Sequence, residues 1–196
     1  MNVNRIPVYV VVPTYNEAQS ILVLLEEVFG LGIENIHVLI VDDNSPDGTG
    51  NLADALAAQH PGRVLAVHRS AKLGLGTAYL AGFERAFDLQ ADCVMTMDAD
   101  FSHDPNMISE FLEKLETCDV VIGSRFMNSK SIDSWSLTRK SLTYMGHFLT
   151  RMLLRMPYDA TGAFRAYRLD RIPRHAFERA QFTGYSFVFE ILYLLY

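Results

Sequence analysis

Two aspartates that follow a short apolar run in the middle of the chain have types and spacing suited to chemistry. Asp98 and Asp100 come directly after residues 94–97. Two carboxylates at positions i and i+2 repel each other unless a cation lies between them. A hard divalent ion such as Mg²⁺ or Mn²⁺ binds carboxylate oxygens together with substrate phosphates. The pair therefore indicates a site for a metal ion and a phosphate group.

A capped turn is the alternative interpretation of these acids. Asp104 followed by Pro105 fits a helix N-cap with proline at the first helical position. We assign Asp104 to this structural role, and both interpretations stay open for Asp98 and Asp100.

The elements that must position these acids follow a repeating order of strand, polar loop and helix. Continuous apolar runs are typical of strands buried on both faces, and each run ends in a polar cluster. The alternation predicts an α/β fold with a mostly parallel, doubly wound sheet and helices on both faces, so the polar clusters should converge at one edge. The predicted strands are residues 8–12, 37–41, 64–67, 94–97 and 119–123, and the predicted helices lie within residues 21–30, 52–56, 75–86 and 106–116.

A glycine-containing turn at residues 74–76 raises the question of a dinucleotide site. The dinucleotide fingerprint G-x-G-x-x-G belongs after the first strand, where the sequence is instead PTYN, and neither this motif nor the P-loop motif occurs in the chain. A hydride-transferring enzyme and a P-loop phosphotransferase are therefore disfavoured. Gly74 and Gly76 can permit a tight loop and close helix packing, and Lys72 could still reach a ligand.

Length and composition favour one domain. The 196 residues are 49% hydrophobic, which suffices for one substantial core. Residues 1–124 carry 6 Lys and Arg against 18 Asp and Glu, whereas residues 125–196 carry 11 against 5. The opposite net charges of −12 and +6 suggest different tasks for the two parts. Cys93 and Cys118 have no zinc or disulfide spacing, and we expect both thiols to be buried and reduced.

No stretch of the sequence is long and apolar enough to span a bilayer, and the first residues lack a signal-peptide pattern. We therefore expect a cytoplasmic protein. Residues 142–156 combine apolar side chains with Arg151 and Arg155, which fits a helix lying on a membrane surface or, equally, a helix packed on the core.

Five motifs follow one another along the chain. They are VPTYNE at 12–17, VDDNSPDGT at 41–49, KLGLGTAY at 72–79, MDADFSHDP at 97–105 and GSRF at 123–126. Together they resemble family-two glycosyltransferases of the GT-A fold, and within that family the dolichol-phosphate (polyprenol monophosphate) mannosyltransferases. The resemblance continues through Trp135, Arg139 and the segments 161–167 and 184–187, so it spans nearly the whole chain.

The resemblance implies roles for particular residues. Asp98, Ala99 and Asp100 would hold the diphosphate of a nucleotide sugar through Mg²⁺ or Mn²⁺, and Ser102 stands at the position of a third metal ligand. Arg125 would lie near the donor diphosphate and Arg139 near the acceptor phosphate, so Asp98, Asp100, Arg125 and Arg139 are the expected catalytic residues. The remaining nucleotide-binding residues would be Pro13, Tyr15, Glu17, Ile40 and Asp42.

The resemblance also implies an activity, which is the inverting transfer of mannose from GDP-mannose to a polyprenyl (dolichyl) phosphate. A phosphate monoester is already an anion at neutral pH, so we assign no general base. A sibling enzyme that uses UDP-glucose and a catalytically silent nucleotide-sugar-binding protein stay open as alternatives. We expect a nucleotide-sugar donor, a lipid acceptor at a membrane surface and no nucleic-acid partner, and the sequence predicts no particular oligomeric state.

The sequence departs from the resemblance in its C-terminal part. The acceptor loop after Arg125 lacks glycine, Ala163 replaces a usual glycine, and the chain ends at Tyr196 before a further strand and basic loop of the family. We therefore expect residues 1–125 to form the nucleotide-sugar-binding half and residues 126–196 a truncated acceptor-side region of the same domain. Peripheral attachment to the cytoplasmic face of a membrane is a second expectation for its location.

Overall fold

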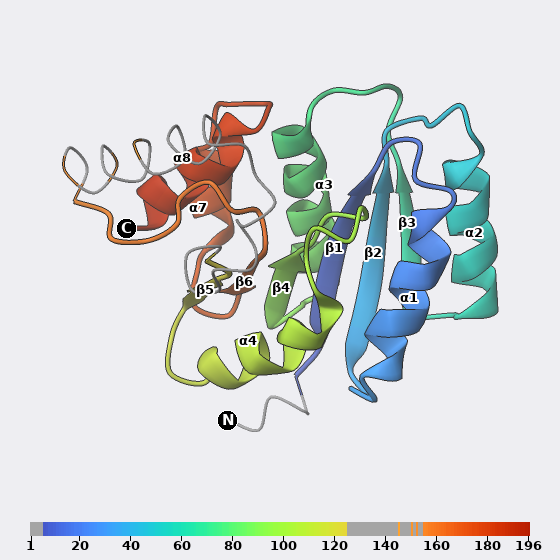
Figure 1. Cartoon of the computed structure of the whole chain (residues 1–196), viewed down its shortest axis with the longest axis horizontal. Helices are drawn as coiled ribbons and strands as arrows, with labels where there is room; N and C mark the ends of the chain where they lie inside the picture. Colours follow the sequence, from blue (N-terminus) through green and yellow to red (C-terminus); the bar gives the residue numbers. More distant parts are fainter. Residues whose placement is uncertain (1–5, 125–144, 146–149, 151, 153–154) are drawn as a thin grey trace.

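A mixed six-stranded sheet is the centre of the molecule in a computed structural model, which describes residues 6–124, 145, 150, 152 and 155–196 (Figure 1). The strand order is β3-β2-β1-β4-β6-β5. β1 pairs in parallel with β2 and β4, and β2 pairs in parallel with β3, whereas β6 is antiparallel to both β4 and β5. The strands are β1 (Val8–Thr14), β2 (Ile36–Asp42), β3 (Val64–His68), β4 (Cys93–Thr96), β5 (Val120–Ile122) and β6 (Arg165–Arg168).

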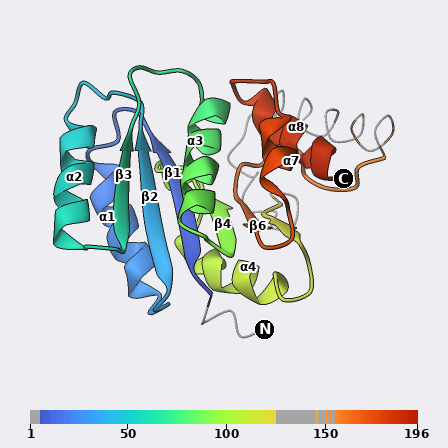
Figure 2. The same ribbon diagram turned by 180° about the vertical axis from the view of Figure 1, so that it is seen from behind.

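Helices cover both faces of this sheet (Figures 1 and 2). Because side chains alternate along a strand, Val10 of β1 points into one core, which α1, α2 and α4 close, and Val11 points into the other, which α3, α7 and α8 close. The helices are α1 (Ser20–Gly30), α2 (Thr49–Gln59), α3 (Leu75–Asp88), the 3₁₀ turn η2 (Pro105–Met107), α4 (Ile108–Lys114), α7 (Arg174–Glu178) and α8 (Ser186–Leu195).

Local sequence explains the helix boundaries nearest the acidic turn. Asp104 caps η2, because its carboxylate accepts a hydrogen bond of 2.9 Å from the backbone N–H of Asn106, and Pro105 occupies the first helical position. The structural role predicted for Asp104 is confirmed. α3 begins directly after Gly74, whose φ of 103° lies in a region that L side chains rarely adopt.

The predicted α/β architecture with a mostly parallel sheet is confirmed, and all five predicted strands are present, but the prediction missed a sixth strand, β6. β6 lies between β4 and β5 and runs against both of them. Its sequence begins and ends with arginine, which is not the pattern of a buried strand, yet Arg165 and Arg168 are 0% and 1% exposed. Arg165 donates hydrogen bonds to the carbonyls of Ala160, Gly162 and Val188, and these bonds permit its burial.

The two cysteines and the segment 142–156 were also the subject of predictions. Cys93 is buried in β4 as predicted, but Cys118 is exposed, because it lies in the turn that follows α4 and not in the strand itself. Most of the segment 142–156, for which a surface helix and a core helix were both considered, lies outside the described residues. Among the helices that the structure describes, none combines the length and apolar character needed to cross a membrane.

Candidate functional site

The carboxyl ends of β1, β2 and β4 bring the polar clusters of the sequence together. Thr14 lies opposite Asp42 in the β1–β2 pair, and the backbone N–H of Asp43 donates to the Thr14 carbonyl at 3.0 Å. β4 pairs with β1 on its other side, with Thr96 opposite Val11, so the turn that follows β4 emerges beside the end of β1. The predicted convergence of these clusters at one edge of the sheet is confirmed.

Asp98 is held by hydrogen bonds from two directions. The Tyr79 hydroxyl of α3 donates to Asp98 Oδ1 at 2.7 Å. The backbone N–H of Asp98 donates to His103 Nδ1 at 3.0 Å, and His103 Nε2 lies 3.9 Å from Asp98 Oδ2. The Asp98 side chain is 26% exposed, so it is partly accessible to a ligand.

Asp100 lies at the exposed end of the same turn. Its Oδ1 accepts a hydrogen bond of 3.0 Å from the backbone N–H of Ser102. Burial acts to raise the pKa of Asp100, but the hydrogen bonds from Ser102 act to lower it, and the pKa lies below its ordinary value. Asp100 is therefore ionised at neutral pH, as a metal ligand must be. Ala99 between the two acids is buried.

The donor chemistry of this turn fits a hard divalent cation. Asp98 and Asp100 each accept a hydrogen bond from the protein on Oδ1. Their Oδ2 atoms are therefore the candidate ligands of a cation. Within the described residues no group of three or more His, Cys, Asp or Glu side chains surrounds such a point. Mg²⁺ commonly binds through one or two carboxylates and completes its coordination with water and substrate phosphates, so two aspartates suffice for it.

Asp42 lies at the end of β2 in a polar setting. It is 2% exposed and accepts hydrogen bonds from Thr14 Oγ1 at 3.2 Å, from the Ser45 N–H at 3.0 Å and from Ser45 Oγ at 2.5 Å. Beside it lies an open pocket of about 250 Å³, which passes over the start of α2. The pocket is lined by Asp42, Asn44, Ser45, Gly48, Gly50, Asn51, Asp54 and His68.

The other nucleotide-site residues suggested by the sequence occupy different environments. Tyr15 is 36% exposed, and Lys72 Nζ lies 4.0 Å from the centre of its ring. Glu17 accepts a hydrogen bond of 2.5 Å from Ser20 Oγ and lies where the loop after β1 meets α1. Pro13 is the sixth residue of β1. Ile40 pairs through its backbone with β1 and β3, and its side chain is fully buried in the core.

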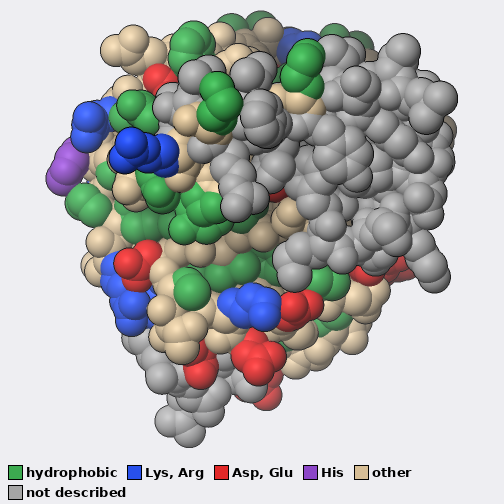
Figure 3. All heavy atoms as spheres, turned by 60° about the vertical axis from the view of Figure 1, so that its left-hand side comes forward, with side chains coloured by type: hydrophobic (Ala, Val, Ile, Leu, Met, Phe, Trp, Pro, Cys, Tyr) green, Lys and Arg blue, Asp and Glu red, His purple; other side chains and the backbone are tan. Residues whose placement is uncertain are grey.

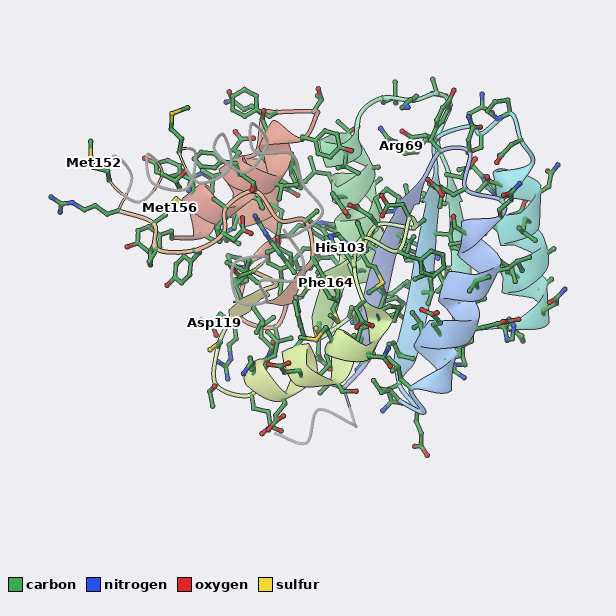
Figure 4. The ribbon with its side chains drawn as sticks, viewed as in Figure 1. Arg69, His103, Asp119, Met152, Met156 and Phe164 are labelled. Carbon is green, nitrogen blue, oxygen red and sulfur yellow. The ribbon has the colours of Figure 1, made fainter. Side chains whose placement is uncertain are left out.

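A buried ion pair near these residues was not predicted. Arg69 Nη1 lies 2.7 Å from Asp43 Oδ1, and both side chains are 8% exposed (Figure 4). Burial raises the pKa of Asp43 despite the opposing charge of Arg69. Arg69 also donates to Thr77 Oγ1 at 2.5 Å and to the Gly74 carbonyl, so it ties the loop before α3 to the end of β2. One feature of the sequence could have indicated this ion pair. Arg69 directly follows β3, at the edge of the sheet where acidic residues gather.

The structure leaves part of the predicted site undescribed. Arg125 and Arg139, with Trp135, lie outside the described residues. Tyr79 and His103 bond to Asp98 but were not among the predicted site residues, although both fall inside the motifs KLGLGTAY and MDADFSHDP.

Similarity to known proteins extends over most of the chain. Residues 9–172 match the model of glycosyl transferase family 2. An undecaprenyl-phosphate mannosyltransferase of Micrococcus luteus is 38% identical over 92% of this chain and 74% of the relative. A polyprenol monophosphomannose synthase of Mycolicibacterium smegmatis is 36% identical over 93% of this chain and 69% of the relative.

Solved structures share the fold at lower identity. Glucosyl-3-phosphoglycerate synthase of Mycobacterium tuberculosis, in complex with Mn²⁺, UDP and phosphoglyceric acid, superposes with a TM-score of 0.66 at 19% identity. The alignment covers 96% of this chain but 63% of that structure. A mannosyltransferase of Pyrobaculum calidifontis in complex with GDP-Man and Mn²⁺ superposes with a TM-score of 0.58 at 22% identity, over 89% of this chain and 46% of that one.

These likenesses confirm the expected GT-A fold, and the family match includes every strand that ends at the acidic rim. With its cluster of carboxylates at the carboxyl ends of β1, β2 and β4, the chain belongs to glycosyl transferase family 2.

Proposed function

We propose that the protein transfers mannose from GDP-mannose to a polyprenyl phosphate, with inversion at the anomeric carbon and with the help of a divalent cation. The observation that carries this proposal is the turn holding Asp98 and Asp100, placed beside the ends of β1 and β2. It occurs in a chain 38% and 36% identical to relatives named for mannose and polyprenyl phosphate.

The donor would lie across the rim formed by the three strand ends. Asp98 and Asp100, with Ser102, would hold Mg²⁺ or Mn²⁺ against its diphosphate, and the cation would offset the charge that develops on that leaving group. Mn²⁺ is present in the solved complexes of two structural neighbours, which supports a divalent ion here. The nucleotide would contact Pro13, Tyr15, Glu17 and Asp42, and Ile40 would lie beneath the site with its side chain in the core.

The acceptor phosphate needs no protein base, since one of its oxygens is already ionised and can attack the anomeric carbon directly. Its attack from the side opposite the diphosphate inverts the configuration. By resemblance to the family, Arg125 would contact the donor diphosphate and Arg139 the acceptor phosphate.

A lipid acceptor requires apolar as well as cationic contacts, and residues 126–196 would supply them. Several large apolar side chains are exposed in the described part of this region. On the face shown in Figure 3, hydrophobic side chains gather with Lys and Arg side chains among them. Peripheral contact with a membrane is part of this proposal. The exposed side chains include Tyr158, Phe182, Tyr185, Tyr193 and Tyr196.

Transfer can be measured with radiolabelled GDP-mannose, a short polyprenyl phosphate and Mn²⁺ or Mg²⁺. We expect a mannosyl lipid that is absent when a chelator is added, and a much smaller signal from UDP-glucose. Asp100→Ala should lower the rate about 100-fold or more, because charge stabilisation at the diphosphate is worth roughly 3 kcal/mol.

Asp104→Ala is the matched control, because Asp104 lies in the same turn but caps η2. It should lose about 1 kcal/mol of stability and keep its activity. Transfer from UDP-glucose alone would replace the proposed donor, and binding of GDP without any product from the folded wild-type chain would overturn transfer altogether.

A further inference from the structure

Asp98 lies between the two hydrophobic cores. On the side of each core, one side chain that packs on that core forms a hydrogen bond with Asp98. From the core that α3, α7 and α8 close comes Tyr79, which is 1% exposed and packs beside Phe83 and Phe187. Its hydroxyl donates to Asp98 Oδ1 at 2.7 Å. A buried tyrosine whose one polar atom meets a carboxylate can hold that carboxylate in one rotamer.

From the other core comes a stack of rings that ends at the acidic turn. Phe111 of α4 stacks on Phe164 with ring centroids 4.4 Å apart, and Phe164 stacks on His103 at 5.0 Å with an interplanar angle of 14° (Figure 4). Phe164 directly precedes β6, and Thr96 at the end of β4 donates to the neighbouring carbonyl of Ala163. The strand missing from the sequence prediction therefore supports the turn.

The hydrogen bond from Asp98 N–H to His103 Nδ1 defines the orientation and tautomer of that ring. Since Nδ1 accepts, Nε2 carries the proton in the neutral ring, and this N–H lies 3.9 Å from Asp98 Oδ2. The ring thus holds the backbone of Asp98, while Tyr79 holds the side chain.

We propose that Tyr79 and His103 are positioning residues that fix Asp98 as a ligand for the divalent cation of the transfer reaction. The inference rests on the proposed function, because it requires Asp98 to bind the cation. Groups that hydrogen-bond to metal ligands typically change metal affinity by about 10- to 100-fold when they are removed. Neither residue touches the reacting atoms.

The test of Tyr79 measures the dissociation constant of Mn²⁺ by electron paramagnetic resonance, with and without GDP. Tyr79→Phe keeps the buried ring and removes only the hydroxyl, and we expect Mn²⁺ to bind about 10-fold more weakly. Tyr9→Phe is the matched control, because Tyr9 is also a buried tyrosine of the same core but lies at the start of β1, away from the rim. The control should bind Mn²⁺ like the wild-type chain.

The test of His103 uses the same measurement. His103→Ala removes both the acceptor for Asp98 N–H and the stack on Phe164, and should weaken Mn²⁺ binding about 10-fold. His103→Asn restores an acceptor near the position of Nδ1 and should recover part of the affinity. His60→Ala is the control, since His60 contacts the Phe29 ring edge to face but lies at the end of α2, away from the rim.

Thermal unfolding of each metal-free variant separates positioning from general stability. If Tyr79→Phe and His103→Ala only lower the metal-free melting temperature and bind Mn²⁺ as tightly as the wild-type chain, the positioning role is wrong while the proposed function stands. Failure of the folded wild-type chain to bind Mn²⁺ in the presence of GDP would overturn both.

Discussion

Individual arginines stabilise the strand β6 and the rim in ways that depend on their burial. Arg168 makes a two-bond contact with Asp170, at 2.7 Å from Nε and 2.6 Å from Nη2, and its side chain is 1% exposed. Arg69 pairs with Asp43 in a similarly buried setting. Removing one partner of such a pair leaves the other charge in the protein interior without compensation, and this costs far more than the loss of a surface pair.

The first prediction concerns Asp170→Asn. Hydrogen bonds from Arg168, and then its charge, lower the pKa of Asp170 below its ordinary value. This pair therefore adds stability above the unfolded pKa of about 4, and the contribution is lost as the pH falls through the folded value. The variant should lose about 2 kcal/mol at pH 7, less than for a fully buried pair because Asp170 is 29% exposed.

Urea unfolding at pH 7 and pH 3 provides the measurement, and the difference from wild type should shrink at pH 3. Asp119→Asn is the control, because Asp119 pairs with Arg171 at 2.8 Å on the surface, where both side chains are about half exposed (Figure 4). It should cost less than about 1 kcal/mol. Equal losses in the two variants would contradict the importance of burial.

The second prediction concerns Arg69→Met, which keeps most of the side-chain volume. The variant leaves the carboxylate of Asp43 buried, and we expect a loss of about 3 kcal/mol in the free energy of unfolding at neutral pH. Since burial raises the pKa of Asp43 even with Arg69 present, the variant should regain stability as the pH falls and Asp43 becomes protonated.

A double-mutant cycle with Asp43→Asn isolates the pair, and the double variant should recover more than half of the loss. Asp54→Asn serves as the control, because the contact of Asp54 with His68 at 2.8 Å lies on the surface. Additive effects of the two substitutions would exclude coupling between Asp43 and Arg69.

Among the elements, α3 packs closely against the sheet, and this close packing depends on a small residue. A Cβ added at Gly82 would lie 2.3 Å from Val11 Cγ1 of β1. At the first turn of the helix, a Cβ at Gly76 would meet the Phe187 side chain of α8 and the carbonyl of Phe182. α3 is therefore fixed against β1 and α8, and through Tyr79 it reaches the acidic turn.

The third prediction tests this packing. Gly82→Ala should lower the free energy of unfolding by about 2 kcal/mol, because the added methyl group overpacks the contact with Val11. Gly30→Ala is a control at the end of α1, where no heavy atom lies within 4 Å of the added Cβ, and it should be neutral or gain about 0.5 kcal/mol. Chemical denaturation compares the two variants, and a stable Gly82→Ala protein would show that α3 can move away from β1.

At the scale of the whole molecule, the sheet separates two large cores, and no helix in the described part of the chain contributes to both. Residues from β1 to β6 contribute to both cores, and α7 and α8, from the C-terminal part of the chain, complete the core that α3 begins. Opening the sheet must therefore expose both cores together, which favours cooperative unfolding of the described residues.

The fourth prediction uses the thiols to follow that opening. Burial raises the pKa of the Cys93 thiol to about 12, whereas Cys118 is exposed. A disulfide reagent at pH 8 should modify Cys118 quickly and Cys93 only when the chain unfolds, because the thiolate is the reactive form. Counting modified thiols in the native state and in urea provides the measurement. Cys118→Ser should abolish the fast phase, and rapid reaction of both thiols in the native protein would contradict a closed sheet.

Local sequence patterns were enough to predict the alternation of strands and helices. They also predicted that the polar clusters lie at one edge of the sheet. Apolar runs such as 37–41 and the cap at Asp104 are local signals, and parallel strands bring their carboxyl ends together whatever their order. The acids Asp98 and Asp100 could be found this way, because they directly follow a strand. Their direct use as ligands is still a prediction.

The side chains that form hydrogen bonds with Asp98 and Asp100 are known only from the tertiary structure. Arg165 is buried among backbone carbonyls, and Tyr79 forms a hydrogen bond with Asp98. The local sequence pattern around each residue does not indicate these contacts. The insertion of β6 beside β4 also depends on pairing over a separation of about 70 residues, which no local pattern encodes. Burial of a charge or a hydroxyl depends on partners that are distant in sequence, so its environment is known only when the chain has folded.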